Sequence, residues 1–150
     1  MAILAVVVAL AVPTLHGFAA GHRVSYCADE IARLAQWART QAMARGMTYR
    51  LYLDPSARQY QVKMVLDDGT VTTLGEDFGQ LFKAPEEVTR LAWNAPQHQD
   101  GQYIEFSPNG RSEPAKIIIY GPNGQVFQVA CFSATELYHL ETADELAQNL

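Results

Sequence analysis

The chain has 150 residues, of which 49% are hydrophobic and 18% are charged, and its formal net charge is −5. This length fits one domain with a substantial core, and an acidic balance without clustered Lys and Arg argues against a nucleic-acid backbone as the main partner. The two cysteines fit neither a zinc site, because no histidine stands at ligand spacing from them, nor a disulfide-dense scaffold.

The first twelve residues are all Met, Ala, Ile, Leu or Val. A twelve-residue helix is about 18 Å long, which is shorter than the roughly 30 Å hydrocarbon core of a bilayer. Pro13 is expected to kink such a helix rather than end it. A helix that is apolar on all sides needs lipid or other helices around it. We therefore expect a membrane or filament-core segment made of Ile3, Leu4, Val6, Val7, Val8, Leu10, Val12 and Pro13.

A second helical pattern continues to Arg45 and ends at Gly46, a residue that commonly terminates helices. Its apolar residues recur at steps of three and four, and the stripe includes Cys27. The pattern predicts one long helix from Met1 to Arg45, kinked at Pro13. Its second half is expected to pack on a sheet through Ile31, Leu34, Ala35, Ala38 and Ala42.

After Gly46 the hydrophobic pattern alternates with the period of β-strands. Alternating segments are TYRLYL, QYQVKMVL, TVTTL, VTRLAW, QYIEF, AKIIIY and QVFQVACF. The turn signals DPSAR and Asp68-Gly69 separate the first three, and two Pro-Asn-Gly turns separate the last three and predict a meander. Residues 75–87 are expected to form a loop or short helix, and APQHQDG to form a loop.

These elements predict an α+β fold, in which a long N-terminal helix packs on an antiparallel sheet or sandwich of about seven strands. We expect three parts: the apolar part of the helix at 1–23, a globular domain at 24–134 and an acidic tail at 135–150. Within this tail, DELAQNL is expected to form a short helix.

The four histidines, at positions 16, 22, 98 and 139, belong to no catalytic or metal-binding motif. A nucleophile elbow, a phosphate-binding loop and a dinucleotide fingerprint are also lacking. His98 is a weak catalytic candidate in a loop, and Asp67-Asp68-Gly69 is a weak calcium candidate that a turn explains better. We expect no catalytic site, no cofactor and no metal.

The two cysteines fall on apolar faces of different elements. Cys27 lies on the helix stripe, and alternation places Cys131 on the same face as Phe127 and Val129. If that face packs on the helix, both thiols point into one interface. A single disulfide in an oxidising compartment and two buried free thiols are both open, because sequence does not determine connectivity.

Three stretches of the chain resemble a known family. AILAVVVALAVPTL resembles the later part of a type IV pilin-like N-terminal helix, and ADEIARLAQWARTQAMARGMTYRLYLD resembles the minor pseudopilin H family of type II secretion, the GspH/FimT family. The Ala38-Arg39 and Gln41-Ala42 pairs stand in the matching places. IEFSPNGRSEPAKIIIYGPNGQVFQV is similar to the late family signature, with a turn motif carried by Phe106, Pro108, Asn109, Gly110 and Arg111.

The resemblance implies a structural subunit and not an enzyme. Its helix would anchor the protein in the bacterial inner membrane as a single pass and pack among major and minor pseudopilins in a periplasmic filament for protein export across the outer membrane. The sheet domain would lie in the periplasm, and the acidic composition of the chain leads us to expect no nucleic-acid partner. Family members begin with a basic leader, a Gly cleavage site, a Phe that undergoes methylation and a nearby glutamate. Either these lie upstream of Met1, which we favour, or Met1 is the true start and the protein is not processed.

Three alternatives remain. A signal peptide followed by a secreted β domain would use the small residues of FAAGH for cleavage, but the charged start of a signal peptide is missing. FimT-like pilus components that bind DNA for uptake would need a basic cluster. Residues 135–150 instead carry four acidic residues and no Lys or Arg, namely Glu136, Glu141, Asp144 and Glu145. An extracytoplasmic enzyme has no set of residues to support it.

Overall fold

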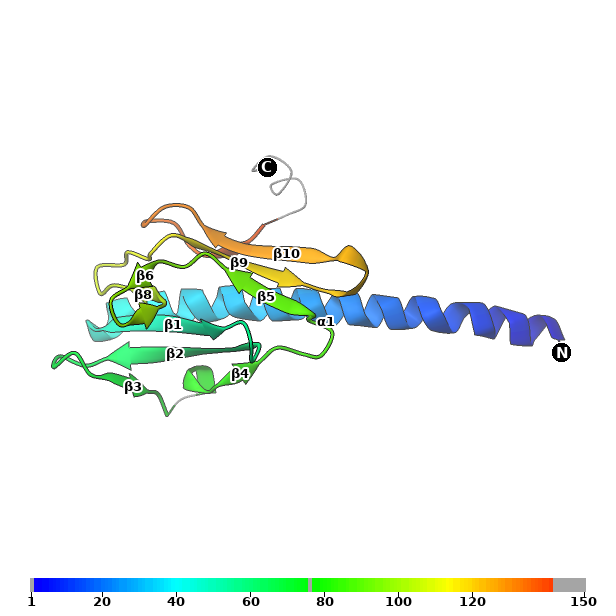
Figure 1. Cartoon of the computed structure of the whole chain (residues 1–150), viewed down its shortest axis with the longest axis horizontal. Coiled ribbons are helices and arrows are strands. Elements are labelled where there is room, and N and C mark those ends of the chain that lie inside the picture. The colour runs from blue at the N-terminus through cyan, green and yellow to red at the C-terminus, as the bar shows by residue number, and fades with distance from the viewer. Residues whose placement is uncertain (1, 76, 142–150) are drawn as a thin grey trace.

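A computed structural model describes residues 2–75 and 77–141, and the side chains from Ala19 onward within these ranges. One continuous helix, α1 (Ala2–Arg45), forms the first third of the chain (Figure 1). Pro13 does not end it. The helix stops where Gly46 takes a positive φ of 66°, and the Met47 amide donates to the Ala42 carbonyl oxygen at 3.2 Å. The predicted single long helix is confirmed.

The first sheet follows α1 directly. It contains β1 (Thr48–Asp54), β2 (Gln59–Val65), β3 (Val71–Thr73), β4 (Phe82–Lys83) and β8 (Ile104–Phe106). Its order is β3-β2-β1-β8, and β4 also pairs with β2. The Asp54 carboxylate closes the first turn by accepting from the Ser56 and Ala57 amides, and Gly69 closes the second with a φ of +83°. Alternation along β1 buries Tyr49, Leu51 and Leu53.

The second sheet has the order β11-β10-β9-β5. Its strands are β5 (Arg90–Trp93), β9 (Ala115–Tyr120), β10 (Val126–Cys131) and β11 (His139–Leu140). A small hairpin of β6 (Gln97–His98) and β7 (Gly101–Gln102) stands apart, and two short 3₁₀ turns are η1 (Asp77–Gly79) and η2 (Pro122–Gly124). Both sheets pack on the same length of α1, through β1 and β8 on one side and β9, β10 and β11 on the other (Figure 1).

The expected α+β, pilin-like fold is confirmed, but the number of strands is higher than predicted. The described residues form eleven strands in place of about seven. The four additional strands, β4, β6, β7 and β11, have two residues each. Two residues are too few to show an alternating pattern, so only pairing with a neighbour reveals them. As a result, the predicted loops at 75–87 and 95–101 contain β4 and the β6–β7 hairpin.

The predicted meander is wrong at its first turn. β8 pairs with β1 in the first sheet, with Tyr49 opposite Phe106 and Leu51 opposite Ile104. Only β9 and β10 form the expected hairpin. Residues 107–114 therefore carry the chain from one sheet to the other, which the alternating pattern of each strand could not indicate.

The domain extends further toward the C-terminus than position 134. Tyr138 is fully buried, and β11 pairs with β10 through Leu140 opposite Val129. The expected acidic tail therefore begins with residues that belong to the core. The helix expected for DELAQNL lies outside the described residues.

Candidate functional site

The junction between α1 and the two sheets determines how the domain sits on its helix. The five residues predicted to pack on the sheets, Ile31, Leu34, Ala35, Ala38 and Ala42, are all buried. Val24, Ala28 and Ala32 are buried as well, because sheets on two sides cover more than one stripe. The alanines bring the helix backbone close to the strands, because a methyl group leaves room for β1 and β10 side chains such as Leu51 and Val129.

Polar side chains of α1 contact loops of the domain at three levels. Arg39 Nε donates to the Gly110 carbonyl oxygen at 2.7 Å, and Gln36 Nε2 donates to the Tyr138 carbonyl oxygen at 2.7 Å. Nearer the N-terminus, Arg23 forms an ion pair with Glu87. These partners lie far away in the sequence, so only the fold reveals them.

The β9–β10 turn contacts the most N-terminal part of this junction. A Cβ on Gly121 would approach the Val24 side chain to 3.0 Å, and one on Gly21 would approach Gln125 Nε2 to 2.6 Å. Before this level α1 extends beyond the sheets (Figure 1). The predicted filament-core residues, Ile3 to Pro13, lie in this extension, in the part of α1 whose side chains are outside the described set.

The family turn motif connects the first sheet to the C-terminal end of α1. Phe106 is fully buried and meets Tyr138 edge to face at 5.9 Å between ring centroids. The Ser107 amide donates to the Arg111 carbonyl oxygen at 2.8 Å, and the Arg111 amide donates to the Asn109 side chain at 3.1 Å.

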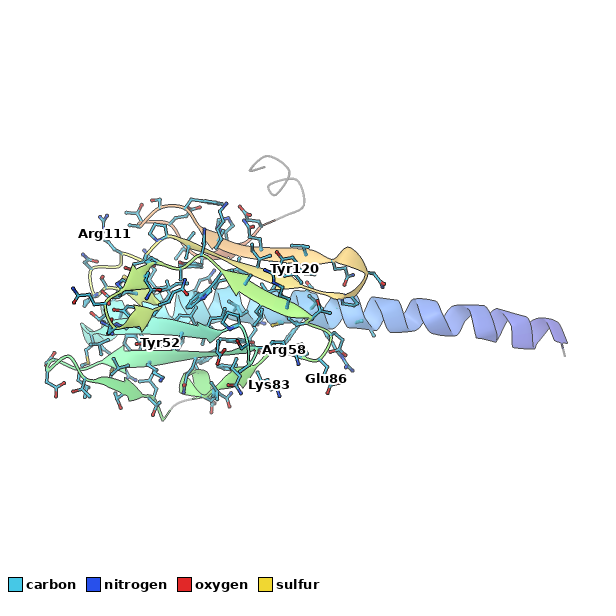
Figure 2. The ribbon with its side chains drawn as sticks, viewed as in Figure 1. Tyr52, Arg58, Lys83, Glu86, Arg111 and Tyr120 are labelled. Carbon is cyan, nitrogen blue, oxygen red and sulfur yellow. The ribbon has the colours of Figure 1, made fainter. Side chains whose placement is uncertain are left out.

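The other members of the motif form the tip of this turn. Pro108, Asn109 and Arg111 are exposed, and Figure 2 shows Arg111 at the end of the domain away from the projecting helix. Gly110 is buried against Met43 of α1 with a φ of +85°. The motif therefore supplies a backbone carbonyl oxygen and a close contact to the helix, and not a reactive side chain.

The cysteines are free in the structure, so the disulfide between Cys27 and Cys131 is not formed. The Cys131 thiol donates to the Ser133 carbonyl oxygen at 3.0 Å and lies close enough to Arg39 for that charge to oppose the burial that raises its pKa. Cys131 therefore lies near the level of Arg39, which is about 18 Å further along the helix than Cys27. A disulfide needs Cα atoms within about 7 Å of each other. The two thiols therefore face the same interface at different levels.

Cys27 belongs to a small buried network with Tyr60 and Glu30. Tyr60 Oη donates to Glu30 Oε1 at 2.5 Å and lies 3.8 Å from Cys27 Sγ. Burial raises the pKa of the Cys27 thiol to about 11 and also raises that of Tyr60. The neutral forms of both groups are favoured, which suits a structural contact and not a nucleophile.

Alkylation is expected to find two free, protected thiols. At pH 8 the native protein should react slowly with iodoacetamide, and in urea without reductant it should gain two carbamidomethyl groups by intact mass. A chain that gains none in urea would contain a disulfide.

Because the folded pKa of Cys27 lies above its ordinary value of 9.0, the thiol contributes stability below pH 9.0 that is lost as the pH rises toward about 11.

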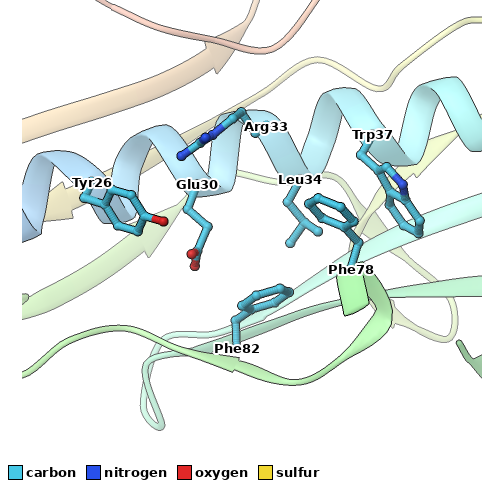
Figure 3. A pocket seen from close by; sticks show the side chains of 7 residues that line it. All are labelled: Tyr26, Glu30, Arg33, Leu34, Trp37, Phe78 and Phe82. Carbon is cyan, nitrogen blue, oxygen red and sulfur yellow. The ribbon is translucent and has the colours of Figure 1, made fainter. Parts of the chain in front are cut away.

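A hollow lies along the solvent-facing side of α1 (Figure 3). Its volume is 260 Å³, and it is lined by Tyr26, Glu30, Arg33, Leu34 and Trp37 of α1, with Phe78 of η1 and Phe82 of β4. Trp37 and Phe78 stack with ring centroids 5.2 Å apart, and Phe82 stacks on Tyr60 at 5.6 Å. Sequence periodicity missed this feature because Phe78 and Phe82 come from a segment without a clear pattern.

The weak chemical candidates take ordinary structural positions. His98 stacks on Tyr103 at 4.0 Å and lies 3.1 Å from the Glu113 carboxylate, while Asp68 accepts the Thr70 amide within a turn. Within residues 2–75 and 77–141, no three His, Cys, Asp or Glu side chains are grouped so that they could hold a metal ion. No helix in the described part of the chain is both long enough and apolar enough to cross a membrane.

Comparisons with known proteins agree with the fold. The family model for type II transport protein GspH matches residues 28–135. No curated protein sequence matches the chain. Among solved structures, the minor pseudopilin EpsH of the Vibrio cholerae type 2 secretion system is similar with a TM-score of 0.66 at 12% identity, covering 80% of this chain and 97% of EpsH.

A second EpsH crystal structure gives the same TM-score at 10% identity, covering 79% of this chain and 93% of EpsH. The type IV minor pilin FimU of Pseudomonas aeruginosa has a TM-score of 0.61 at 14% identity, covering 82% of this chain and 91% of FimU. At these identities the likeness shows the fold, while the family model covers most of the described domain.

Proposed function

This chain belongs to the GspH family of type II transport proteins, and on that premise we propose that it is a structural subunit of a periplasmic filament that contributes to protein export across the outer membrane. Membership makes it a minor pseudopilin of a type II secretion or type IV pilus-like system, a class of protein that assembles with other pseudopilins. The family is structural, and the proposed role needs no catalysis and no cofactor.

One observation carries the proposal: α1 extends beyond the domain with an apolar sequence, while its later part is held by two sheets (Figure 1). Residues 1–12 contain no charged or polar side chain, so this part of the helix is stable only among lipids or other apolar helices. We propose that it anchors the protein in the inner membrane as a single pass before assembly. The domain at 24–134 and the residues after it would lie in the periplasm.

The test places a charge in the apolar run. Leu10→Asp in the full chain is expected to reduce incorporation into filaments by about tenfold or more, because an unpaired carboxylate in an apolar helix bundle costs several kcal/mol. Incorporation is measured by co-purification with the other pseudopilins from membrane extracts. Asp67→Ala, which removes an exposed charge in the turn after β2, is the control and should assemble normally.

N-terminal sequencing of the membrane-extracted protein separates this proposal from a secreted β domain. A chain that begins after Ala20 would have lost the apolar run, and the pseudopilin role would be wrong. Normal assembly of the Leu10→Asp variant would contradict the proposal that the apolar part of α1 packs in the filament.

The likeness to FimU supports a second candidate, a minor type IV pilin. The two roles differ in the phenotype of a deletion strain. Loss of secreted enzymes from the culture medium with normal twitching motility would support secretion, and the reverse would support a pilus role.

DNA binding of the FimT kind is expected to be absent. Two arginines of the domain already have carboxylate partners: Arg50 contacts Asp100 and Glu105, and Arg33 contacts Asp29. Lys83 and Arg111 are separated across the domain (Figure 2). A gel-shift titration at physiological salt should therefore show no complex, whereas micromolar binding that weakens with added salt would contradict this expectation.

A further inference from the structure

The hollow in Figure 3 is one half of a longer surface feature. A second hollow of 320 Å³ adjoins it and shares Tyr26 and Glu30; its other lining residues are His22, Arg23, Cys27, Lys83 and Pro85. We call the two together the helix groove. It follows α1 from His22 to Trp37, which is a length of about 22 Å at the rise of an α-helix.

The walls of the helix groove expose aromatic surface to solvent. The Tyr26 side chain is 58% exposed and Phe78 is 45% exposed. The two rings lie toward opposite ends of the first hollow, with Tyr26 on the helix and Phe78 on η1 stacked against Trp37 (Figure 3). Apolar residues scattered singly over a surface are common, but several exposed rings along one groove are typical of an interaction site.

Three charged side chains beside the helix groove have partners within the chain, while Lys83, which also lines it, is exposed. Arg33 pairs with Asp29 at 3.0 Å and Arg23 pairs with Glu87. Glu30 accepts the Tyr60 hydroxyl. An occupant therefore needs to bring few or no charges of its own, and a strongly charged ligand such as a nucleic acid or an acidic peptide would find little to pair with.

The position of the helix groove points to the same kind of occupant. It begins at His22, close to the level where α1 leaves the sheets, so it continues along the surface of the projecting helix (Figure 1). A helix lying beside that projection would reach the groove without changing direction. The uncharged run at the start of this chain is about 18 Å long as a helix, which is close to the length of the groove.

We propose that the helix groove binds an uncharged, apolar α-helix of a neighbouring filament subunit, lying alongside α1 between Tyr26 and Phe78. The mode is that of an apolar helix in a hydrophobic groove. The inference rests on the proposed function, because it takes a filament subunit as the partner. It goes further by assigning the contact to residues of the globular domain.

Photo-crosslinking in cells that produce the full set of pseudopilins tests the proposal. The photoreactive residue p-benzoylphenylalanine replaces Tyr26 or Phe78 in the full chain, and mass spectrometry maps the product. The expected product joins either position to the apolar N-terminal helix of another pseudopilin. The control is Phe132, which is 44% exposed but lies outside the helix groove, and it should give no such product.

Replacing Leu10 with p-benzoylphenylalanine separates this inference from the proposed function. Products from Leu10 without products from Tyr26 and Phe78 would overturn the groove contact and leave the filament role standing. Absence of products at all three positions would overturn both. Products that join Tyr26 or Phe78 to a globular domain or to a protein of another class would also overturn the groove contact.

A charged variant gives a second readout, with folding checked separately. Phe78→Glu is expected to lower the crosslink yield from Tyr26 by about tenfold, because a carboxylate would face an apolar helix. Phe132→Glu should leave that yield unchanged. Circular dichroism melting curves show whether both variants remain folded, and an unchanged yield in a folded Phe78→Glu variant would overturn the proposal.

Discussion

Replacing Ile31 with alanine is expected to lower the free energy of unfolding by about 2–5 kcal/mol, which is a large part of the stability of a domain of this size. Ile31 is fully buried in the face of α1 that meets the sheets. Removing three methyl or methylene groups there loses their burial and leaves a cavity that the close-packed alanines around it cannot fill. Urea unfolding followed by circular dichroism measures the difference.

The matched control for Ile31→Ala is Val126→Ala. Val126 is an apolar residue of β10 with an exposed side chain, so its truncation should change stability by no more than about 0.5 kcal/mol. Equal losses in the two variants would mean that the buried face of α1 does not contribute to holding the domain. In that case the helix and the sheets would have to be treated as independent units.

Replacing Gly110 with alanine is expected to destabilise the protein by about 1–3 kcal/mol. Gly110 has a φ of +85°, which residues with a Cβ rarely adopt. A Cβ there would also lie 2.9 Å from Met43 Sδ, so the methionine or the turn must move. Movement of the turn would weaken the hydrogen bond from Arg39 to the Gly110 carbonyl oxygen. Thermal unfolding monitored by circular dichroism measures the effect.

Gly69→Ala separates the two causes. Gly69 has nearly the same φ, +83°, but no atom lies within 4 Å of a Cβ placed on it. Its substitution reports backbone strain alone, and the additional loss in Gly110→Ala reports the contact with Met43. Adding Met43→Ala to Gly110→Ala should recover that additional part. If Gly69→Ala loses as much stability as Gly110→Ala, the contact with α1 contributes nothing.

Sequence patterns predicted the elements whose signal is local. The helical stripe that contains Ile31 and Ala38 and the terminating Gly46 predicted α1. Alternation and turn residues predicted the seven longest strands, because each pattern is repeated within a few neighbouring residues. The turn at Gly110 was predicted from its Pro-Asn-Gly sequence, and it also carries the family motif. Its contact with Met43 was not predictable, because Met43 is distant in sequence.

The assignment of strands to sheets could not be predicted. The stretch around Phe106 reads as a member of a meander with the strand that follows it, yet β8 pairs with β1 across more than fifty residues. Alternation states which face of a strand is buried and leaves its neighbour undetermined. The two-residue strands and the separation of Cys27 from Cys131 along α1 also depend on which strands pair with each other.

The sequence by itself thus determined the long helix, the strand-rich domain, the absence of a recognisable catalytic motif and the family. The tertiary structure alone decided the division into two sheets, the two free thiols and the helix groove between Tyr26 and Phe78. The physical reason is the range of the forces involved. Helical and strand periodicities arise from backbone geometry within a few residues, whereas pairing partners, thiol separations and grooves arise where distant segments pack together.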